Sequence, residues 1–184
     1  DSKWSLSGNF SVDKIELVEG HLLLNENQVK MNELISSGLQ SKTLTLEKTT
    51  ISGVSSLSLD LSGMLLESQN AKITVPALEA YSFDLGSNIF NGTIELTGGE
   101  ISVNGNGVID RVEGFGNLIA NGNHAWSNFD LSEGSSVTLK EATTQLLTNS
   151  FNLQASSLNP ISLSSSGTGL ALSLIHISEP TRQA

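Results

Sequence analysis

Four aspartates recur along the chain at nearly regular intervals, and their type and spacing could support chemistry. Asp60, Asp84, Asp110 and Asp130 follow one another at similar but unequal intervals, and Asn152 continues the series. Carboxylates that repeat once per structural unit would form a row with neighbours about 5 Å apart. Such a row could bind Ca²⁺, which takes about six to eight oxygen ligands, or could act in a polysaccharide-cleaving enzyme.

The alternative is that these aspartates form a solvated face that discourages sideways aggregation of strands. We expect this alternative, because Asn152 interrupts the row and the intervals between the aspartates are irregular. Asp60, Asp84, Asp110 and Asp130 therefore stay as candidates for a metal site, while the prediction is that the chain holds no metal and no cofactor.

Other residues that commonly form reactive centres are few. The chain has no cysteine, so disulfides, thiolate metal sites and cysteine nucleophiles are excluded. His21 and His124 have no neighbouring histidine or paired carboxylate in the sequence, which argues against zinc. The serine-nucleophile motif Gly-x-Ser-x-Gly and phosphate-binding loops are absent from the sequence.

Two further features bear on an enzyme or a sugar-binding protein. Arg111 beside Asp110 is a local pair of a base and an acid that an enzyme acting on polysaccharide could use. Trp4 and Trp126 could stack on sugar rings if they were exposed, although packing in the core or at a turn is the expectation for each. We therefore predict that the protein is not an enzyme.

Composition limits the partners of the chain. Its 184 residues include 9 basic and 19 acidic residues, which give a formal net charge of -10. This charge disfavours nucleic acids and anionic membranes as partners, since both need a basic surface. The sequence also lacks an apolar run of about 18 residues, so no membrane insertion of this segment is expected.

The aspartates belong to a recurring unit of two short alternating strands, and this unit predicts the fold. Its copies begin at Phe83-Asp84-Leu85, Phe129-Asp130-Leu131 and Phe151-Asn152-Leu153, with a looser copy at Leu59-Asp60-Leu61. A repeat of about 22 residues is typical of a solenoid, so we predict an all-β parallel β-helix with about 22 residues per coil. Phe83, Phe129 and Phe151 should then be buried in one stack. The alternative fold is an antiparallel β-sandwich.

Residues 1–171 are predicted to form one β-solenoid, in which residues 1–40 are the least regular part. Residues 27–36 could form a short helix or strands, and strands are favoured. The chain begins in strand-like alternation and without Met, so we expect a fragment that is truncated at both ends. Uncapped coils at the ends of such a fragment should fray or associate.

The last residues differ in character from the repeats. The string from Leu172 to Arg182, Leu-Ser-Leu-Ile-His-Ile-Ser-Glu-Pro-Thr-Arg, resembles the translation of a transposase-type sequencing adapter. The resemblance implies that residues 172–184 are a non-native tail. Such a tail is left out of fold reasoning, and His176 within it is not a candidate ligand.

The coils rich in Ser, Thr, Asn and Gly between Thr43 and Leu163 resemble the repetitive passenger regions of bacterial autotransporters and filamentous-haemagglutinin-like adhesins. This resemblance implies a right-handed parallel β-helix that is secreted or displayed on the bacterial surface. It also implies a non-catalytic role as a stalk or adhesin, with a glycan or protein of a host or cell surface as partner. Fragments of a β-helical polysaccharide lyase or hydrolase, or of a trimeric phage tail spike, are the alternatives.

Overall fold

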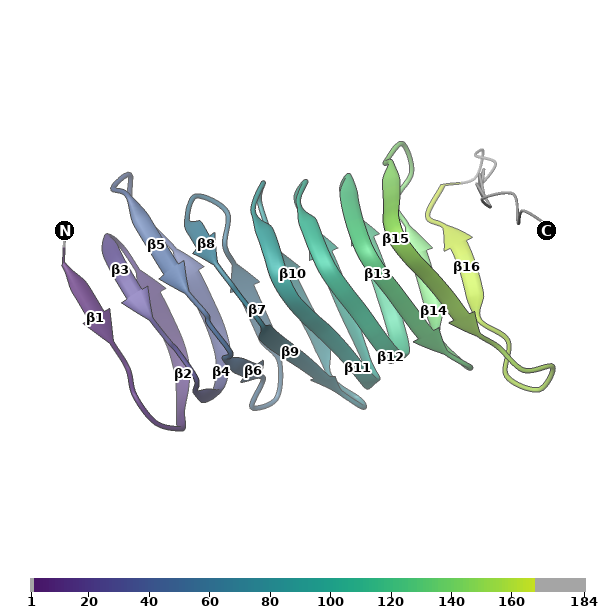
Figure 1. Ribbon diagram of the computed structural model, residues 1–184, viewed down its shortest axis with the longest axis horizontal. Helices are drawn as coiled ribbons and strands as arrows, with labels where there is room; N and C mark the ends of the chain where they lie inside the picture. The colour runs from purple at the N-terminus through teal and green to yellow at the C-terminus, as the bar shows by residue number, and fades with distance from the viewer. Residues whose placement is uncertain (1, 168–184) are drawn as a thin grey trace, which may run out of the picture.

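The computed structural model of the chain describes residues 2–167, and these residues fold into an elongated stack of β-strands (Figure 1). Sixteen strands and no helix occur in this range. Every strand pairing within it is parallel. The parallel β-solenoid is thus confirmed and the antiparallel sandwich is excluded. It has about eight coils of about 20 residues, slightly fewer than the predicted number per coil. The tail at 172–184 lies outside the described residues.

The strands lie in three rows along the solenoid, which we call the first, second and third faces. The first face begins with β1 (Lys3–Ser5), β3 (Gly20–Leu23), β5 (Lys42–Thr45) and β8 (Leu65–Glu67). The remaining strands are β2 (Phe10–Leu17), β4 (Gln28–Ser36), β6 (Thr50–Ser52), β7 (Leu57–Asp60), β9 (Ala71–Pro76), β10 (Ala80–Asp84), β11 (Ile89–Asn104), β12 (Val108–Asn121), β13 (His124–Ser132), β14 (Ser136–Leu139), β15 (Gln145–Gln154) and β16 (Ser162–Ser165). The second face contains β6 and β9, and the third face contains β7, β10, β14 and β16; longer strands such as β11 bend across more than one face.

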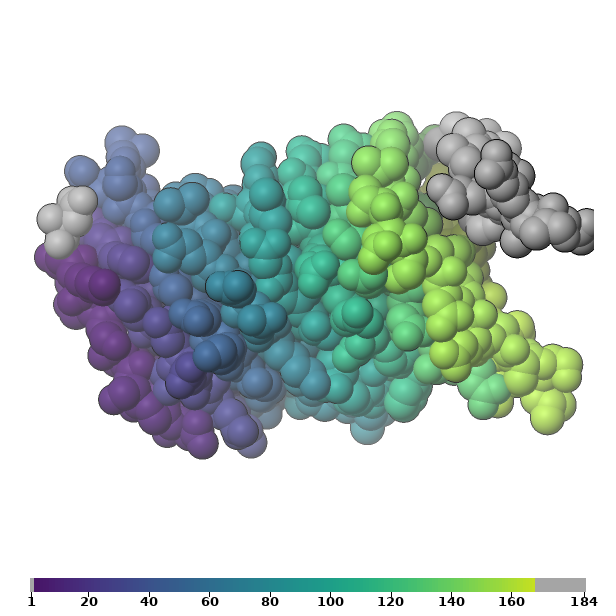
Figure 2. All heavy atoms as spheres, viewed as in Figure 1, coloured from purple at the N-terminus to yellow at the C-terminus, as the bar shows by residue number. Residues whose placement is uncertain are grey.

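The coils differ in length, yet their strands stay in register. The coil that leads from Asn104 to its partner Asn121 is short, whereas the coil that leads from Val137 to its partner Leu163 is long. The difference lies in the corners between faces, because each face keeps direct strand-to-strand pairing. In Figure 2 the coils accordingly follow one another along the body in sequence order.

The core consists of rows of inward side chains, one residue from each coil. On the second face the register joins one continuous row: Phe10, Val29, Ile51, Ile73, Ile94, Val112, Phe129 and Phe151. The members from Val29 to Phe129 are buried. Each buried side chain of this size contributes about 1.5 to 3 kcal/mol, and it gains this by contact with the coils on either side.

The predicted stack of three phenylalanines is correct for two of them. Phe129 pairs directly with Phe151, with ring centroids 5.6 Å apart. Phe83 is buried but lies on the third face, between Leu59 and Val103. Phe83 was misplaced because alternating strands look alike on every face, so the type of motif does not identify the face. Phe151 is 38% exposed, contrary to prediction, because β15 pairs only with β13 among the described strands.

The N-terminal part of the chain belongs to the same solenoid. Residues 28–36 form β4, as favoured over the helix, and β4 pairs with β2 on one side and with β6 and β7 on the other. β9 ends at Pro76, which has no N–H to donate to a ladder. Thr97 and Gly98 both pair with Pro76, which places a bulge in β11 at this corner.

Tight corners require glycine at particular positions, and Gly122 is the clearest case. A Cβ atom on Gly122 would overlap the carbonyl oxygen of Gly105 in the preceding coil. Gly134 provides a contrast: its φ is +78°, but no atom lies within 4 Å of a Cβ built there. At Gly122 the close approach of the neighbouring backbone excludes a side chain, whereas at Gly134 only the left-handed backbone conformation disfavours one.

We expect Gly122→Ala to destabilise the fold by about 3 kcal/mol, because the two corners must move apart. The control, Gly134→Ala, should cost about 1 kcal/mol through its left-handed backbone alone. Urea unfolding followed by circular dichroism measures both values. Equal losses in the two variants would contradict the close approach of the two corners.

Candidate functional site

The structure does not bring the four predicted aspartates into one row. Asp60 and Asp84 are direct neighbours on the third face, as the spacing predicted. The next positions in that row are Asn104 and Asn121 rather than further aspartates. Asp130 lies on the second face, where it pairs with Glu113. The assumption of one fixed period failed, because the corners contribute different numbers of residues.

Asp110 stands apart from the other three aspartates. Its neighbour Arg111 pairs with Asn128 of the next coil, so Asp110 lies at the corner that precedes the second face. The Asn128 amide donates to the Asp110 carboxylate at 3.3 Å and to the Asp110 carbonyl oxygen at 3.2 Å. Arg111 does not use Asp110 as its ionic partner: its guanidinium lies 3.6 Å from the Glu113 carboxylate. The carboxylate beside the Arg111 guanidinium is therefore that of Glu113 and not that of its sequence neighbour Asp110.

Asp60 and Asp84 have a local structural role. The Asp60 carboxylate accepts hydrogen bonds from the Ser62 amide at 3.0 Å and from the Ser62 hydroxyl at 2.5 Å. The Asp84 carboxylate likewise accepts one from the Gly86 amide at 2.9 Å. An acidic side chain that bonds the backbone two residues ahead is a standard way to begin a turn. Both aspartates thus shape the corner that follows the third face.

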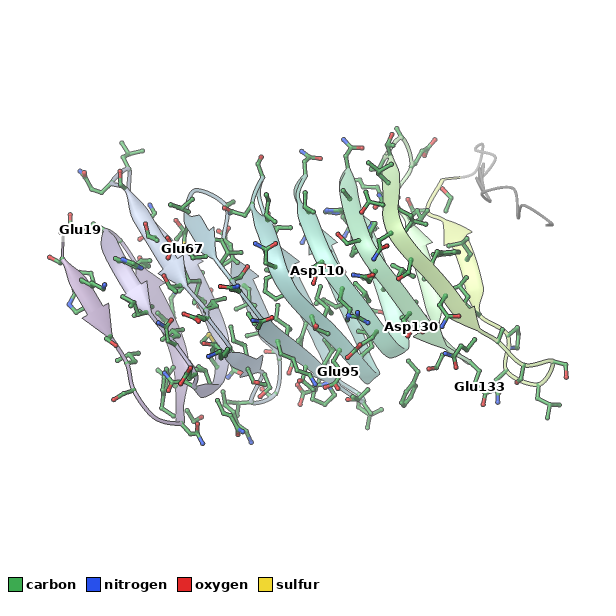
Figure 3. All side chains as sticks on the ribbon, in the orientation of Figure 1. Glu19, Glu67, Glu95, Asp110, Asp130 and Glu133 are labelled. Carbon is green, nitrogen blue, oxygen red and sulfur yellow. The ribbon has the colours of Figure 1, made fainter. Side chains whose placement is uncertain are left out.

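A different acidic row, which we call the acidic row, lies on the second face and contains Glu95, Glu113 and Asp130. Glu95 pairs directly with Glu113, and Glu113 with Asp130, so three consecutive coils present carboxylates side by side. Thr74 precedes the row and Asn152 follows it. In Figure 3 Glu95 and Asp130 lie on the same part of the solenoid, and Asp110 is set apart from them.

The acidic row was missed because its steps are short. The intervals from Glu95 to Glu113 and from Glu113 to Asp130 are both shorter than a typical coil of about 22 residues, so a search at that period passes over them. The sequence did carry a signal for the row. Ile94-Glu-Leu96, Val112-Glu-Gly114 and Phe129-Asp-Leu131 share the pattern of an apolar residue followed by an acid.

Each carboxylate of the acidic row has a donor or cation beside it. Lys72 donates to Glu95 at 2.7 Å, and the Thr74 hydroxyl donates to the other Glu95 oxygen at 3.2 Å. Glu113 has Arg111 at 3.6 Å, and Asp130 accepts from the Asn152 amide at 2.9 Å. These partners offset the repulsion between like charges on adjacent strands. Within residues 2–167 no group of three or more acidic, histidine or cysteine side chains is arranged to hold a metal ion.

A shallow groove of about 400 Å³ runs beside the acidic row. Phe115 is its most exposed large apolar side chain, with 50% of its surface accessible. The groove is lined by Glu95, Leu96, Thr97, Glu113, Gly114, Phe115, Asp130, Ser132 and Gln154. It therefore combines one aromatic ring with carboxylate, hydroxyl and amide groups, all from neighbouring coils.

Glycines surround Phe115 at the edge of this groove. Gly114 and Gly116 flank Phe115 and have φ angles of +99° and +151°. A Cβ on Gly114 would overlap the carbonyl oxygen of Leu96 in the coil below. A Cβ on Gly98 would come within 3.2 Å of the Phe115 ring, so glycine at that position leaves the ring its space.

The two tryptophans are not components of the groove. Trp126 is 2% exposed, and its indole N–H donates to Gln145 at 2.9 Å, which confirms the expected core position. Trp4, contrary to expectation, is 47% exposed and lies on β1 at the N-terminal end of the solenoid. Its exposure reflects the end of the stack, since β1 pairs with β3 alone among the described strands.

The two histidines lie far apart in the stack. His21 contacts the Thr45 hydroxyl at 2.7 Å and lies 4.0 Å from the Glu67 carboxylate. His124 is 2% exposed and packs edge-on against Trp126 with ring centroids 5.3 Å apart. Neither ring nitrogen of His124 has a hydrogen-bond partner in the described part of the chain.

Burial disfavours the charged form of His124. It lowers the pKa of His124 below the ordinary value of 6.5. The backbone of Val103 partly offsets this effect, although it makes no hydrogen bond of acceptable geometry with the ring. The folded state therefore holds His124 as a neutral imidazole at a pH where an unfolded chain would bind a proton.

We expect the folded state to lose stability as the pH falls from 6.5 through the lowered pKa of His124. Over that interval the unfolded chain binds a proton that the folded chain does not. The free energy of unfolding therefore falls by up to about 1.4 kcal/mol for each pH unit. Above the ordinary pKa this contribution is constant. Urea unfolding between pH 5 and pH 8 should show this slope in the parent protein and in His21→Gln, and a reduced slope in His124→Leu. An unchanged slope in His124→Leu would contradict the buried neutral ring.

Calcium should have no specific effect on the fold, because the predicted aspartates do not converge. We expect calcium chloride to change the melting temperature no more than sodium chloride of equal ionic strength. The double variant Asp84→Asn, Asp130→Asn should be neutral or slightly stabilising, since asparagine keeps an acceptor oxygen and removes like-charge repulsion. A rise in melting temperature that is specific to calcium and lost in the double variant would revive the metal site.

No helix in the described residues is long and apolar enough to span a membrane.

Comparison with known proteins adds no assignment to this geometry. The groove beside Phe115 and the acidic row are thus the features from which a function can be argued. No protein-family model, curated protein or solved structure matches the chain.

Proposed function

We propose that the chain is a non-catalytic segment of a secreted or surface-displayed bacterial β-solenoid, which acts as a stalk and binds glycan in the groove beside Phe115. The observation that carries the proposal is the half-exposed Phe115 ring beside three carboxylates from consecutive coils. Grooves of about 300 Å³ or more that combine apolar and polar groups are typical ligand sites. The volume here, about 400 Å³, is within that range.

Glycan suits the chemistry of this groove. The C–H face of a pyranose ring is apolar and can pack on an aromatic ring, while its hydroxyl groups need acceptors. Glu113 and Asp130 supply acceptors, and Thr97, Ser132 and Gln154 line the same groove with neutral polar groups. The excess of carboxylates and the net charge of -10 favour neutral sugars and amino sugars over uronic acids.

The bonding of the carboxylates supports binding rather than catalysis. A glycoside hydrolase needs one carboxyl group as an acid and a second as a base or nucleophile on the scissile bond. Glu95 is already bonded by Lys72 and Thr74, and Asp130 by Asn152. Carboxylates that already accept these hydrogen bonds form a fixed polar surface, which can bind a sugar without cleaving it.

The stacked architecture supports a role as a stalk. About eight coils in parallel register give a rigid rod whose length grows with the number of coils. Side chains that point outward are largely polar, as the alternating burial along β9 and β11 illustrates. A rod of this kind can hold a binding groove away from the surface to which it is attached.

The second candidate function is a β-helical enzyme that acts on polysaccharide. The ion pair of Arg111 with Glu113, beside Glu95 and Asp130, is the observation that favours it. An arginine and several carboxylates in one groove are the residue types that such chemistry uses. The two candidates differ in one measurable respect, because only the enzyme changes the polysaccharide.

Binding is tested with immobilised oligosaccharides from cellulose, mannan and chitosan, with polygalacturonate as the acidic comparison. We expect binding to one of the first three, and a loss of at least about tenfold in Phe115→Ala, because the stacking surface is removed. Leu65→Ala, which alters a similarly exposed side chain on the first face, is the matched control. Absence of binding to all four probes would contradict the glycan proposal. Release of reducing or unsaturated ends that Glu113→Gln abolishes would favour the enzyme.

A further inference from the structure

The groove beside Phe115 runs along the axis of the solenoid, because its lining comes from the successive strands β11, β12, β13 and β15. The acidic row forms one side of the groove. The other side, which we call the corner column, contains Thr97, Phe115, Ser132 and Gln154. Thr97 pairs directly with Phe115, and Ser132 pairs with Gln154. The corner column therefore follows the same coil-by-coil register as the acidic row, and in Figure 3 Glu95 and Asp130 follow one another along the solenoid.

The dimensions of the groove follow from the strand ladder. Adjacent coils lie about 4.8 Å apart, so four coils span about 14 Å from the first to the last. The acidic row and the corner column are two residues apart along each strand, which separates them by about 7 Å. A groove that is longer along the axis than it is wide favours an extended ligand that lies parallel to the axis.

Each coil offers a similar pair of groups to such a ligand. The acidic row presents a carboxylate in three consecutive coils, and the corner column presents a hydroxyl, amide or aromatic group beside it. Between these two sides, Leu96 and Leu131 both pair with Gly114, and both leucines are buried. The floor of the groove therefore has no large outward side chain that would separate one coil from the next.

The charges along the groove disfavour a cationic peptide as its ligand. Lys72 lies 2.7 Å from the Glu95 carboxylate, and Arg111 lies 3.6 Å from the Glu113 carboxylate. In the part of the chain that the structure describes, Asp130 alone among the three acids has no ion pair. A polycation would have to displace both partners, whereas the hydroxyl groups of a sugar can share the carboxylates with them.

We propose that the groove binds a linear β-(1→4)-linked pyranose chain lengthwise, with one sugar residue on each coil. This inference rests on the proposed function. Such a chain is extended, and each residue advances it by about one strand spacing. Phe115 would stack on one ring, and Thr97 would contact the ring on one side of it. Ser132 and Gln154 would contact the two rings on the other side. A sugar that lay across the groove would instead meet the coil of Phe115 alone.

The test measures the affinity of the full chain for β-(1→4)-linked oligosaccharides of one to six residues from cellulose, mannan and chitosan, by isothermal titration calorimetry. In the series that binds, we expect affinity to rise at least about tenfold from the disaccharide to the tetrasaccharide. A further residue should change it by less than about twofold, because that residue extends beyond the last coil of the groove.

A variant at one end of the groove locates the chain along the axis. Gln154→Ala should weaken binding of the tetrasaccharide at least about fivefold and leave the disaccharide on Phe115 unchanged. Gln40→Ala, which alters an exposed glutamine outside the groove, is the matched control and should change neither affinity. Circular dichroism checks that both variants fold, and a general structural defect would weaken both lengths alike.

The outcomes separate this inference from the proposed function. Equal affinity of the parent protein for the disaccharide and the tetrasaccharide would overturn lengthwise binding and leave the glycan-binding function in place. A loss in Gln154→Ala that is the same for both lengths would do so as well. Absence of binding in all three series, at every length, would overturn both the function and the inference.

Discussion

The parallel hydrogen-bonded ladder between successive coils is the constraint on which the rest of this molecule depends. No strand has enough apolar surface to form a core with its own coil, so each inward side chain gains its burial from the coils above and below. The second-face row from Phe10 to Phe151 shows this directly, because exposure rises where the ladder ends. Stability in such a stack is a sum over neighbouring pairs rather than a property of one centre.

The ladder also explains how far the fold could be predicted from the sequence. Alternation of apolar and polar residues indicates strands, and similar units at similar intervals indicate that the strands stack in parallel. Asp60 with Asp84 and Phe129 with Phe151 were matched correctly for this reason. Phe83 was not, since the three faces use the same alternation and nothing in the local pattern distinguishes them.

The site was harder to predict than the fold. Glu95, Glu113 and Asp130 become neighbours only when two coils of unusually short repeat are stacked, and the sequence offers no direct measure of how long each corner is. Phe115 carries no sign of its exposure in isolation, because a phenylalanine between apolar strands is normally a core residue. Its register is what places it outward, since Phe115 pairs with Thr97 while the neighbouring Gly114 pairs with the buried Leu96. The correct register was needed before the groove could be recognised.

The direction of the ladder has a mechanical consequence. Hydrogen bonds between parallel coils point along the long axis of the stack, so a pull on the two ends loads the coil interfaces in series. A terminal coil has one neighbour instead of two, and it would separate first while the interior remained paired. Such a rod would lengthen under tension in steps of one coil, about 20 residues each, and would not break in a single event.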